Sequence, residues 1–272
     1  MVLHVNIFKA IRCTQQKDAD KMFKGEDMKI QDEPDDPRRN FLIHALTMGL
    51  FSSGLISSNV LAQSLFGAKP SKLEPGRSIY RITGEVTVNG KEASLQTRIN
   101  PGDTINTGND SEIIFIVNDQ SMILRSNSHL IIEAAKKDET SLVVKGLRIL
   151  TGKLLTVSRN TPMQVDTPTA TIGVRGTGFY VEADPELSYF CTCYGNTNIQ
   201  SVSDMESRTS VTATHHDRPL YILKNAERGK HIRNAPFVNH TDQELALIEA
   251  LVGRKTPFVF SNDAYTAPRR NY

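Results

Sequence analysis

Turn signals recur across residues 76–182, and they constrain the fold more than any other feature of the sequence. Asn89-Gly90 follows an alternating run at 79–88 and is a strong hairpin signal. Pro101-Gly102 and the polar run 106–111 mark further turns. No helical period runs through this stretch. The spacing of the turns, about every eight to twelve residues, is typical of an all-β sandwich or barrel.

Short apolar or alternating runs between these turns predict the strands. Asn118–Ser121 is predicted as a turn that leads into Met122. The expected strands are 79–83, 85–88, 112–117, 122–124, 130–133, 141–145, 152–157, 188–195, 197–202 and 210–214.

The composition fits a packed domain and argues against three classes of protein. Apolar residues make up 39% of the 272 residues and charged residues 23%, so wholesale disorder is not expected. Lys and Arg number 32 against 30 Asp and Glu, a net charge of +2. Binding to nucleic acid needs clustered cations, so we expect none. Three cysteines are too few for a disulfide scaffold.

Arg38 and Arg39 stand before a moderately apolar run that ends at Ala62. This segment resembles a twin-arginine (Tat) signal peptide, because Arg38, Arg39, Phe41 and Leu42 match the family pattern. Pro37 and Ile43 depart from that pattern, so Sec export stays open.

We expect residues 38–62 to be a signal peptide, cleaved after Ala62, and the protein to be periplasmic or secreted from a bacterium. The alternative is an uncleaved membrane anchor at 41–62, which is long enough to span a bilayer. Residues 1–37 are polar and exceed a normal n-region. The sequence therefore predicts that translation starts at Met28 or Met22 and that residues 1–27 are a mis-assigned start.

Three motifs within residues 76–182 are similar to motifs of FecR domains. Residues 101–108 resemble the element G-D-x-I-x-T-G, and Gly152-Lys153-Leu154 resembles a G-x-L/V strand start. Residues 167–179 match the element T-P-x-A-x-x-x-V-R-G-T-x-F. The positions that carry the resemblance are Gly102, Asp103, Thr107, Gly108, Gly173, Arg175, Gly176, Thr177 and Phe179.

The resemblance implies a β-sandwich-like module that works outside the cytoplasm. FecR itself spans the membrane and relays an outer-membrane iron-citrate signal to a sigma factor. Residues 1–37 are too short and too polar for a sigma-binding domain, so we expect only the periplasmic module to carry over. The motif glycines are expected to serve structure. Arg175 is expected to be a buried ion-pair partner or to donate to a loop carbonyl.

Residues 187–240 differ from the FecR pattern and are rich in metal-ligating side chains. Alternation in a strand at 188–195 places Cys191 and Cys193 on one face, opposite Phe190, Thr192 and Tyr194. His215 and His216 end the strand expected at 210–214, where neighbours face opposite ways. His231 and His240 follow later in the chain.

Four interpretations of this set stay open. Cys191 and Cys193 can bind zinc, copper or iron with one of His215 and His216 and with His231 or His240. They can instead form a disulfide, strained in an extended strand and therefore easily reduced. They can be plain buried thiols with scattered surface histidines. A Cys–His hydrolase would use Cys193 as nucleophile and His215 as base.

Thr241-Asp242-Gln243-Glu244 is a capping box that begins a helix at Asp242–Val252. Leu245, Ile248, Leu251 and Val252 share one helical face, and Gly253 stands where a helix ends. We expect this helix (241–253) to pack as a lid on the β-core. The tail 256–272 is expected to be extended or disordered.

Together these features predict a mostly β protein. A sandwich-like or barrel-like FecR module at 76–182 continues into a Cys/His-rich β extension at 187–240 with one shared core, followed by one helix. The expected function is an exported, non-enzymatic binding or sensing module of the cell envelope, with an envelope protein or small ligand as its unidentified partner. The alternatives are a redox protein that uses Cys191 and Cys193, and a membrane-anchored relay to a sigma-factor system.

Overall fold

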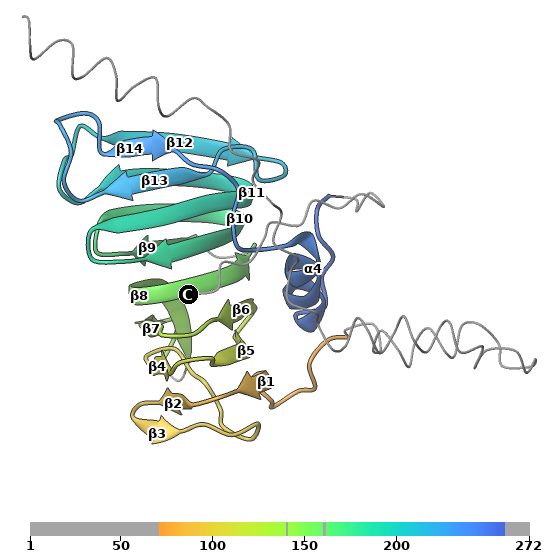
Figure 1. Cartoon of the computed structure of the whole chain (residues 1–272). Helices are drawn as coiled ribbons and strands as arrows, with labels where there is room; N and C mark the ends of the chain where they lie inside the picture. The colour runs from red at the N-terminus through yellow and green to blue at the C-terminus, as the bar shows by residue number, and fades with distance from the viewer. Residues whose placement is uncertain (1–70, 140, 160–161, 259–272) are drawn as a thin grey trace, which may run out of the picture. The chain divides into compact units, whose positions relative to one another are not determined.

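The computed structural model describes residues 71–139, 141–159 and 162–258 (Figure 1). The residues 1–37, the predicted signal peptide 38–62 and most of the predicted tail 256–272 lie outside these residues. The described part is mostly β with one helix, as predicted. It contains no helix that is both long and apolar enough to cross a membrane.

Within the described ranges all strands join one sheet, which Figure 1 shows as a continuous stack. The elements are β1 (Ile79–Thr83), β2 (Val86–Val88), β3 (Lys91–Glu92), β4 (Thr104–Thr107), β5 (Glu112–Val117), β6 (Gln120–Leu124), β7 (His129–Lys136), β8 (Leu142–Ser158), β9 (Met163–Asp166), β10 (Ala170–Ala183), β11 (Leu187–Ser201), β12 (Arg208–Ala213), β13 (Leu220–Leu223), β14 (Ile232–Asn234) and α4 (Asp242–Leu251).

The long strand β8 is the branch point of the sheet. Its first half pairs with β7 and with β9, the latter in parallel, and its second half pairs with β6 and β10. One arm of the sheet therefore runs β7–β4–β2–β3 and the other runs β6–β5–β1. Both arms contribute apolar side chains to the same cluster, and the β6–β5–β1 arm also places Ile114 and Ile123 in a second one. The mostly β architecture is the one that the sequence predicts.

Two strand boundaries predicted at glycines are wrong. The strands predicted at 141–145 and 152–157 are parts of the single strand β8, which begins at Leu142, and those predicted at 188–195 and 197–202 are parts of the single strand β11, which ends at Ser201. Gly152 has a φ of +94°, and a Cβ there would lie 2.0 Å from Ser128 Oγ. A glycine in that conformation bends a strand without ending its pairing.

The turn predictions agree better with the structure. Asn89 and Gly90 have φ values of 52° and 75° and join β2 to β3, which confirms the hairpin. The strand at 112–117 is also confirmed. The predicted turn at 118–121 is two residues too long, because β6 begins at Gln120.

The sheet core is the buried apolar cluster inside the folded sheet. It includes Ile105 and Leu124 from the two arms, and Phe179, Phe190 and Ile222 from the long strands and β13. The rings of Phe179 and Phe190 stack with their centroids 5.2 Å apart. The FecR-like region and the Cys/His-rich region thus contribute to one core.

The helix-side core is a second cluster, between the other face of the sheet and the C-terminal segment. Helix α4 contributes Leu245, Ile248 and Leu251 and contacts β6 and β8 (Figure 1). The capping box is present, since Glu244 N donates to Thr241 Oγ1 at 3.2 Å and Thr241 N donates to Glu244 Oε2 at 3.0 Å. The helix ends one residue earlier than predicted, at Leu251.

The FecR-like motifs make structural contacts. Asp103 accepts hydrogen bonds from Asn100 N at 2.7 Å and from Asn89 Nδ2 at 2.8 Å, and so fastens two turns together. Thr177 Oγ1 donates to Asn196 O at 3.1 Å. Arg175 is exposed, so its predicted burial is wrong. Its neighbour Val174 occupies the inward position, and strand alternation directs Arg175 to solvent.

Candidate metal centre

Strand β11 places two thiols in the helix-side core. Cys191 and Cys193 are both free and both 0% exposed. In the pairing of β11 with β10, Tyr194 lies opposite Gly178 while Thr192 lies opposite Phe179, so Cys193 is an extra residue. This is a β-bulge, which re-aims the side chains that follow it.

The bulge also explains one wrong expectation. Phe190 faces the sheet core, as alternation predicts. Tyr194, expected on the same side as Phe190, lies instead in the helix-side core with both cysteines. There its hydroxyl donates to Glu249 of α4.

His216 reaches the thiols from the turn after β12. Its backbone N–H donates to Cys193 O at 2.9 Å, which ties the turn to the bulge. Its φ is +53°, a left-handed conformation that is uncommon for a residue other than glycine. Its Nδ1 lies 3.5 Å from Cys191 Sγ.

His240 reaches the same point from the opposite side, just before the helix. It is fully buried and immediately precedes Thr241, the N-cap of α4. Its ring stacks on Tyr180 with the centroids 4.5 Å apart. Its Nε2 lies 3.1 Å from His216 Nδ1.

Four of the six predicted ligands therefore meet. The ligand atoms of Cys191, Cys193, His216 and His240 all lie within 4.8 Å of one another. His231 lies apart from them, where its Nδ1 faces Leu223 O at 2.9 Å.

Asp242, the first residue of α4, orients both neighbouring histidines and was missed in the sequence. Its side chain is 3% exposed, and its oxygens lie 3.0 Å from His216 Nε2 and 2.9 Å from His215 Nε2. His215 and His216 thus turn toward one carboxylate, and the prediction that they face opposite ways is wrong. The left-handed φ of His216 removes the strand alternation on which that prediction rested. The sequence signal was an acidic residue in the first helical turn, two positions after His240.

The hydrogen-bond partners define which ring nitrogens carry protons. His240 Nδ1 lies 2.7 Å from Val238 O, and a carbonyl only accepts, so Nδ1 holds the proton. Asp242 likewise holds a proton on His216 Nε2. In the neutral rings, His240 Nε2 and His216 Nδ1 then face each other with lone pairs. A proton or a metal ion between them removes that repulsion.

The electrostatics of the cluster favour a thiolate beside a protonated histidine when no metal is bound. Burial raises the pKa of Cys191, but hydrogen bonds with Cys193, His216 and His240 outweigh burial and hold this pKa well below its usual value. Burial, and then the interaction with Cys191, raise the pKa of Cys193. Burial lowers the pKa of His216, yet Cys191 and Asp242 reverse that effect and the pKa is raised.

The arrangement does not support the Cys–His hydrolase, one of the interpretations that the sequence left open. His215 is directed at Asp242 and not at Cys193. Cys191, His216 and Asp242 form a chain in the order of a nucleophile, base and orienting acid. Both sulfur-bearing residues are nevertheless fully buried, so a substrate could not reach them.

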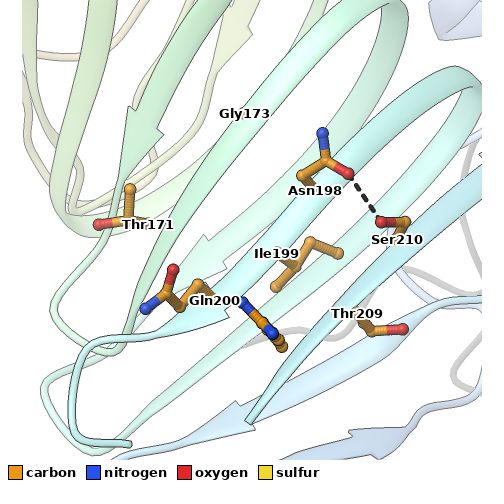
Figure 2. Close-up of a pocket in the computed structure, with 8 residues that line it drawn as sticks. Thr171, Gly173, Asn198, Ile199, Gln200, Thr209 and Ser210 are labelled. Atoms are coloured by element: carbon orange, nitrogen blue, oxygen red, sulfur yellow. Dashed lines mark hydrogen bonds between the residues drawn. The ribbon is translucent and has the colours of Figure 1, made fainter. Parts of the chain in front are cut away.

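An open polar groove lies elsewhere on the sheet (Figure 2). It runs across β10, β11 and β12 over Gly173 and has a volume of about 570 Å³. Figure 2 shows Asn198 bonded to Ser210, whose hydroxyl donates at 2.7 Å. Its lining contains no Cys, His, Asp or Glu. This groove therefore offers none of the side chains that usually bind metal ions, unlike the Cys/His cluster.

Comparison with known proteins agrees with the resemblance seen in the sequence. A family model described as FecR protein matches residues 103–191. That range ends at Cys191, so the other three members of the cluster lie beyond it. No curated protein matches the chain.

Solved structures offer only a distant likeness. Two crystal structures of a proposed anti-sigma factor from Parabacteroides distasonis ATCC 8503, at 2.50 and 1.65 Å resolution, are similar to part of this chain. Each has 18% sequence identity and a TM-score of 0.38, and the match covers 48% of this chain. The chain spans 58% of the length of that protein.

Proposed function

We propose that this protein is a non-enzymatic sensing module of the bacterial cell envelope, of the FecR type, whose input is a transition-metal ion. The observation that carries the proposal is the meeting of four metal-ligating side chains, Cys191, Cys193, His216 and His240, from three separate parts of the chain. Thiolate and imidazole are the ligands that zinc, copper and iron prefer.

The surroundings of the four side chains support metal binding over chance proximity. Metal-bound histidines commonly donate their second ring N–H to a carboxylate or a backbone carbonyl. Asp242 and Val238 O do this for His216 and His240, which leaves a lone pair of each ring directed at the thiols.

The proposed location outside the cytoplasm is argued from the N-terminal sequence. Arg38, Arg39, Phe41 and Leu42 resemble a twin-arginine signal, a type that also exports folded proteins. An exported FecR-type module would meet its metal, or an envelope protein, outside the cytoplasm. If residues 41–62 stay uncleaved, the same module becomes the sensing part of a membrane-anchored relay to a sigma-factor system.

A thiol–disulfide redox function is the second candidate. Both thiols are free, lie on one face of β11 and have strongly different pKa values, with that of Cys191 lowered. A low thiol pKa is typical of reactive cysteines. Complete burial of both residues counts against exchange with another protein.

The test is the metal content of the full chain, exported from bacteria and purified without added metal. We expect about one ion per chain by elemental analysis. Cys191→Ser and His240→Ala should each lose the ion. The matched control is His231→Gln, which changes a buried histidine outside the cluster and should keep it.

Two results would contradict the proposal. One is a folded wild-type protein that holds no transition metal and takes up none when zinc, copper and iron salts are offered. The other is a metal content that His231→Gln lowers as much as His240→Ala does. A metal-free protein whose two thiols oxidise reversibly at one defined potential would favour the redox function instead.

A further inference from the structure

We propose that the ion is zinc and that it fastens the C-terminal segment, residues 235–252, to the sheet. This inference rests on the proposed function, because it names the ion and states what the same site controls. It has two parts, the geometry of the four ligands and the chain segments that they join.

Two of the donor–donor distances match the edges of a tetrahedral zinc site, and all donor atoms lie within 4.8 Å of one another. With Zn–S near 2.3 Å and Zn–N near 2.0–2.1 Å, a tetrahedron has S···N edges of about 3.6 Å and N···N edges of about 3.3 Å. Here Cys191 Sγ and His216 Nδ1 are 3.5 Å apart, and His216 Nδ1 and His240 Nε2 are 3.1 Å apart. A tetrahedral set of two sulfurs and two nitrogens is diagnostic of zinc or an iron–sulfur centre, whereas Cu(II) prefers a tetragonal set.

Burial and charge point to a closed, structural site. Cys191, Cys193 and His240 are all 0% exposed and the His216 side chain is 7% exposed, so the ligand set is largely shielded from solvent. Structural zinc sites have four protein ligands, whereas catalytic ones keep a position for water. Two thiolates and one divalent ion sum to zero charge, which avoids the large cost of a bare buried charge.

The four ligands join three segments that are far apart in sequence. Cys191 and Cys193 belong to the central strand β11, His216 to the turn after β12, and His240 to the chain that enters α4. The ring of Phe237 packs against His216 and His240, with centroids 4.3 and 4.4 Å apart. The start of the C-terminal segment is therefore held in part by this cluster, beside the bonds that Asn239 makes with Arg125 and Glu182.

The two ends of α4 have different anchors. At the first turn, Asp242 contacts His216, and Glu244 pairs with Arg125 at 2.8 Å. At the last turn, Glu249 is fully buried and pairs with Arg159 and Arg254 at 2.8 and 2.7 Å. Loss of the ion should thus loosen residues 235–244 first, while the Glu249 cluster still holds the end of the helix.

The consequence is a metal-dependent cover over one face of the sheet. When residues 235–244 lift, Tyr180 and Tyr189 lose His240 and Val238, which now contact them. An apolar and aromatic surface is then exposed to solvent. Zinc binding therefore keeps this surface covered, and zinc release exposes it.

The experiment is hydrogen exchange by mass spectrometry on the full chain, with zinc, after chelation and after zinc is added back. At a free zinc concentration 100 times the dissociation constant, openings that require release of the ion should become about 100-fold rarer. We expect that slowing in peptides from residues 235–244, and little change in peptides from β4 and β7. The Cys193→Ser variant should not respond to zinc, and His231→Gln should respond as the wild type does.

The outcomes separate this inference from the proposed function. If copper or iron is bound in place of zinc, or if zinc binds and exchange at 235–244 stays the same, the inference is wrong while the metal-sensing function stands. If no metal binds at all, both fail. Chelation and re-addition act on the wild-type protein, so the test does not depend on whether a variant folds.

Discussion

The two cores of this protein are built in different ways. The sheet core is built by the strands of the sheet and consists mainly of aliphatic residues, with Phe115 and the stacked pair Phe179 and Phe190. The helix-side core is closed by a separate segment at the C-terminal end and contains tyrosines and both cysteines, with buried histidines and acids beside them.

This difference suggests separate roles: the sheet core stabilises the fold, and the helix-side core carries the ionisable and metal-ligating side chains. Apolar burial is non-directional and tolerates repacking, so the sheet core needs no single partner. Buried polar groups in the helix-side core each need a specific partner, and an unpaired one is costly. A change of ligand or charge should therefore act on the helix-side core and leave the sheet core intact.

Among the substitutions considered, the largest loss of stability should come from one in the sheet core. We expect Phe190→Ala to lower the free energy of unfolding by about 3–5 kcal/mol, because it removes a stacked, fully buried ring. Urea denaturation measures this. The loss should be the same with zinc and with a chelator. A loss that appears only with zinc would mean that the two cores are not separable.

Within the helix-side core, the largest loss of stability should follow a substitution of Glu249. Glu249→Gln removes a fully buried carboxylate from two arginines and the Tyr194 hydroxyl. We expect a loss of about 3 kcal/mol in urea, below the upper end for buried pairs because both arginines are partly exposed. Zinc content should stay near that of the wild type, since the metal ligands are unchanged. Loss of zinc in this variant would show that the two anchors of α4 act as one.

The helix cap should have a smaller effect. Thr241→Ala deletes the N-cap oxygen that accepts from Glu244 N, and the expected cost is about 1 kcal/mol in thermal or urea unfolding. Thr212→Ala, an exposed threonine on β12, is the matched control. An equal loss in both variants would show that the cap contributes nothing specific.

The smallest change in stability should come from a substitution in the hairpin between β11 and β12. Asp204 accepts from Gly229 N at 2.6 Å and Ser207 Oγ at 2.8 Å, and these bonds, that from Gly229 first, lower its pKa. A lowered pKa in the folded state stabilises the protein above the unfolded pKa of about 3.9, and the benefit disappears as the pH falls through the lowered value. Asp204→Asn should thus lower the melting temperature slightly at pH 6 and by less at pH 2.5. An equal decrease at both pH values would contradict this assignment.

The sequence predicted the local elements well, because their causes are local. Asn89-Gly90 specifies its turn through positive φ, and the Thr241–Glu244 box specifies the start of α4 through hydrogen bonds within one helical turn. Alternation placed Cys191 and Cys193 on one face for the same reason. It failed at Tyr194, because a bulge depends on the register of the neighbouring strand.

By itself, the sequence determined a mostly β chain with one capped helix, a FecR-like motif set and a group of six candidate ligands. Only the tertiary structure decided that His216 and His240 join the thiols, that His231 does not, and that Asp242 orients the centre. The physical reason is that such a site needs residues 191, 216 and 240, which are far apart in sequence, to meet in space. Contacts at that separation follow from strand register, backbone strain at His216 and the docking of α4, none of which a local pattern encodes.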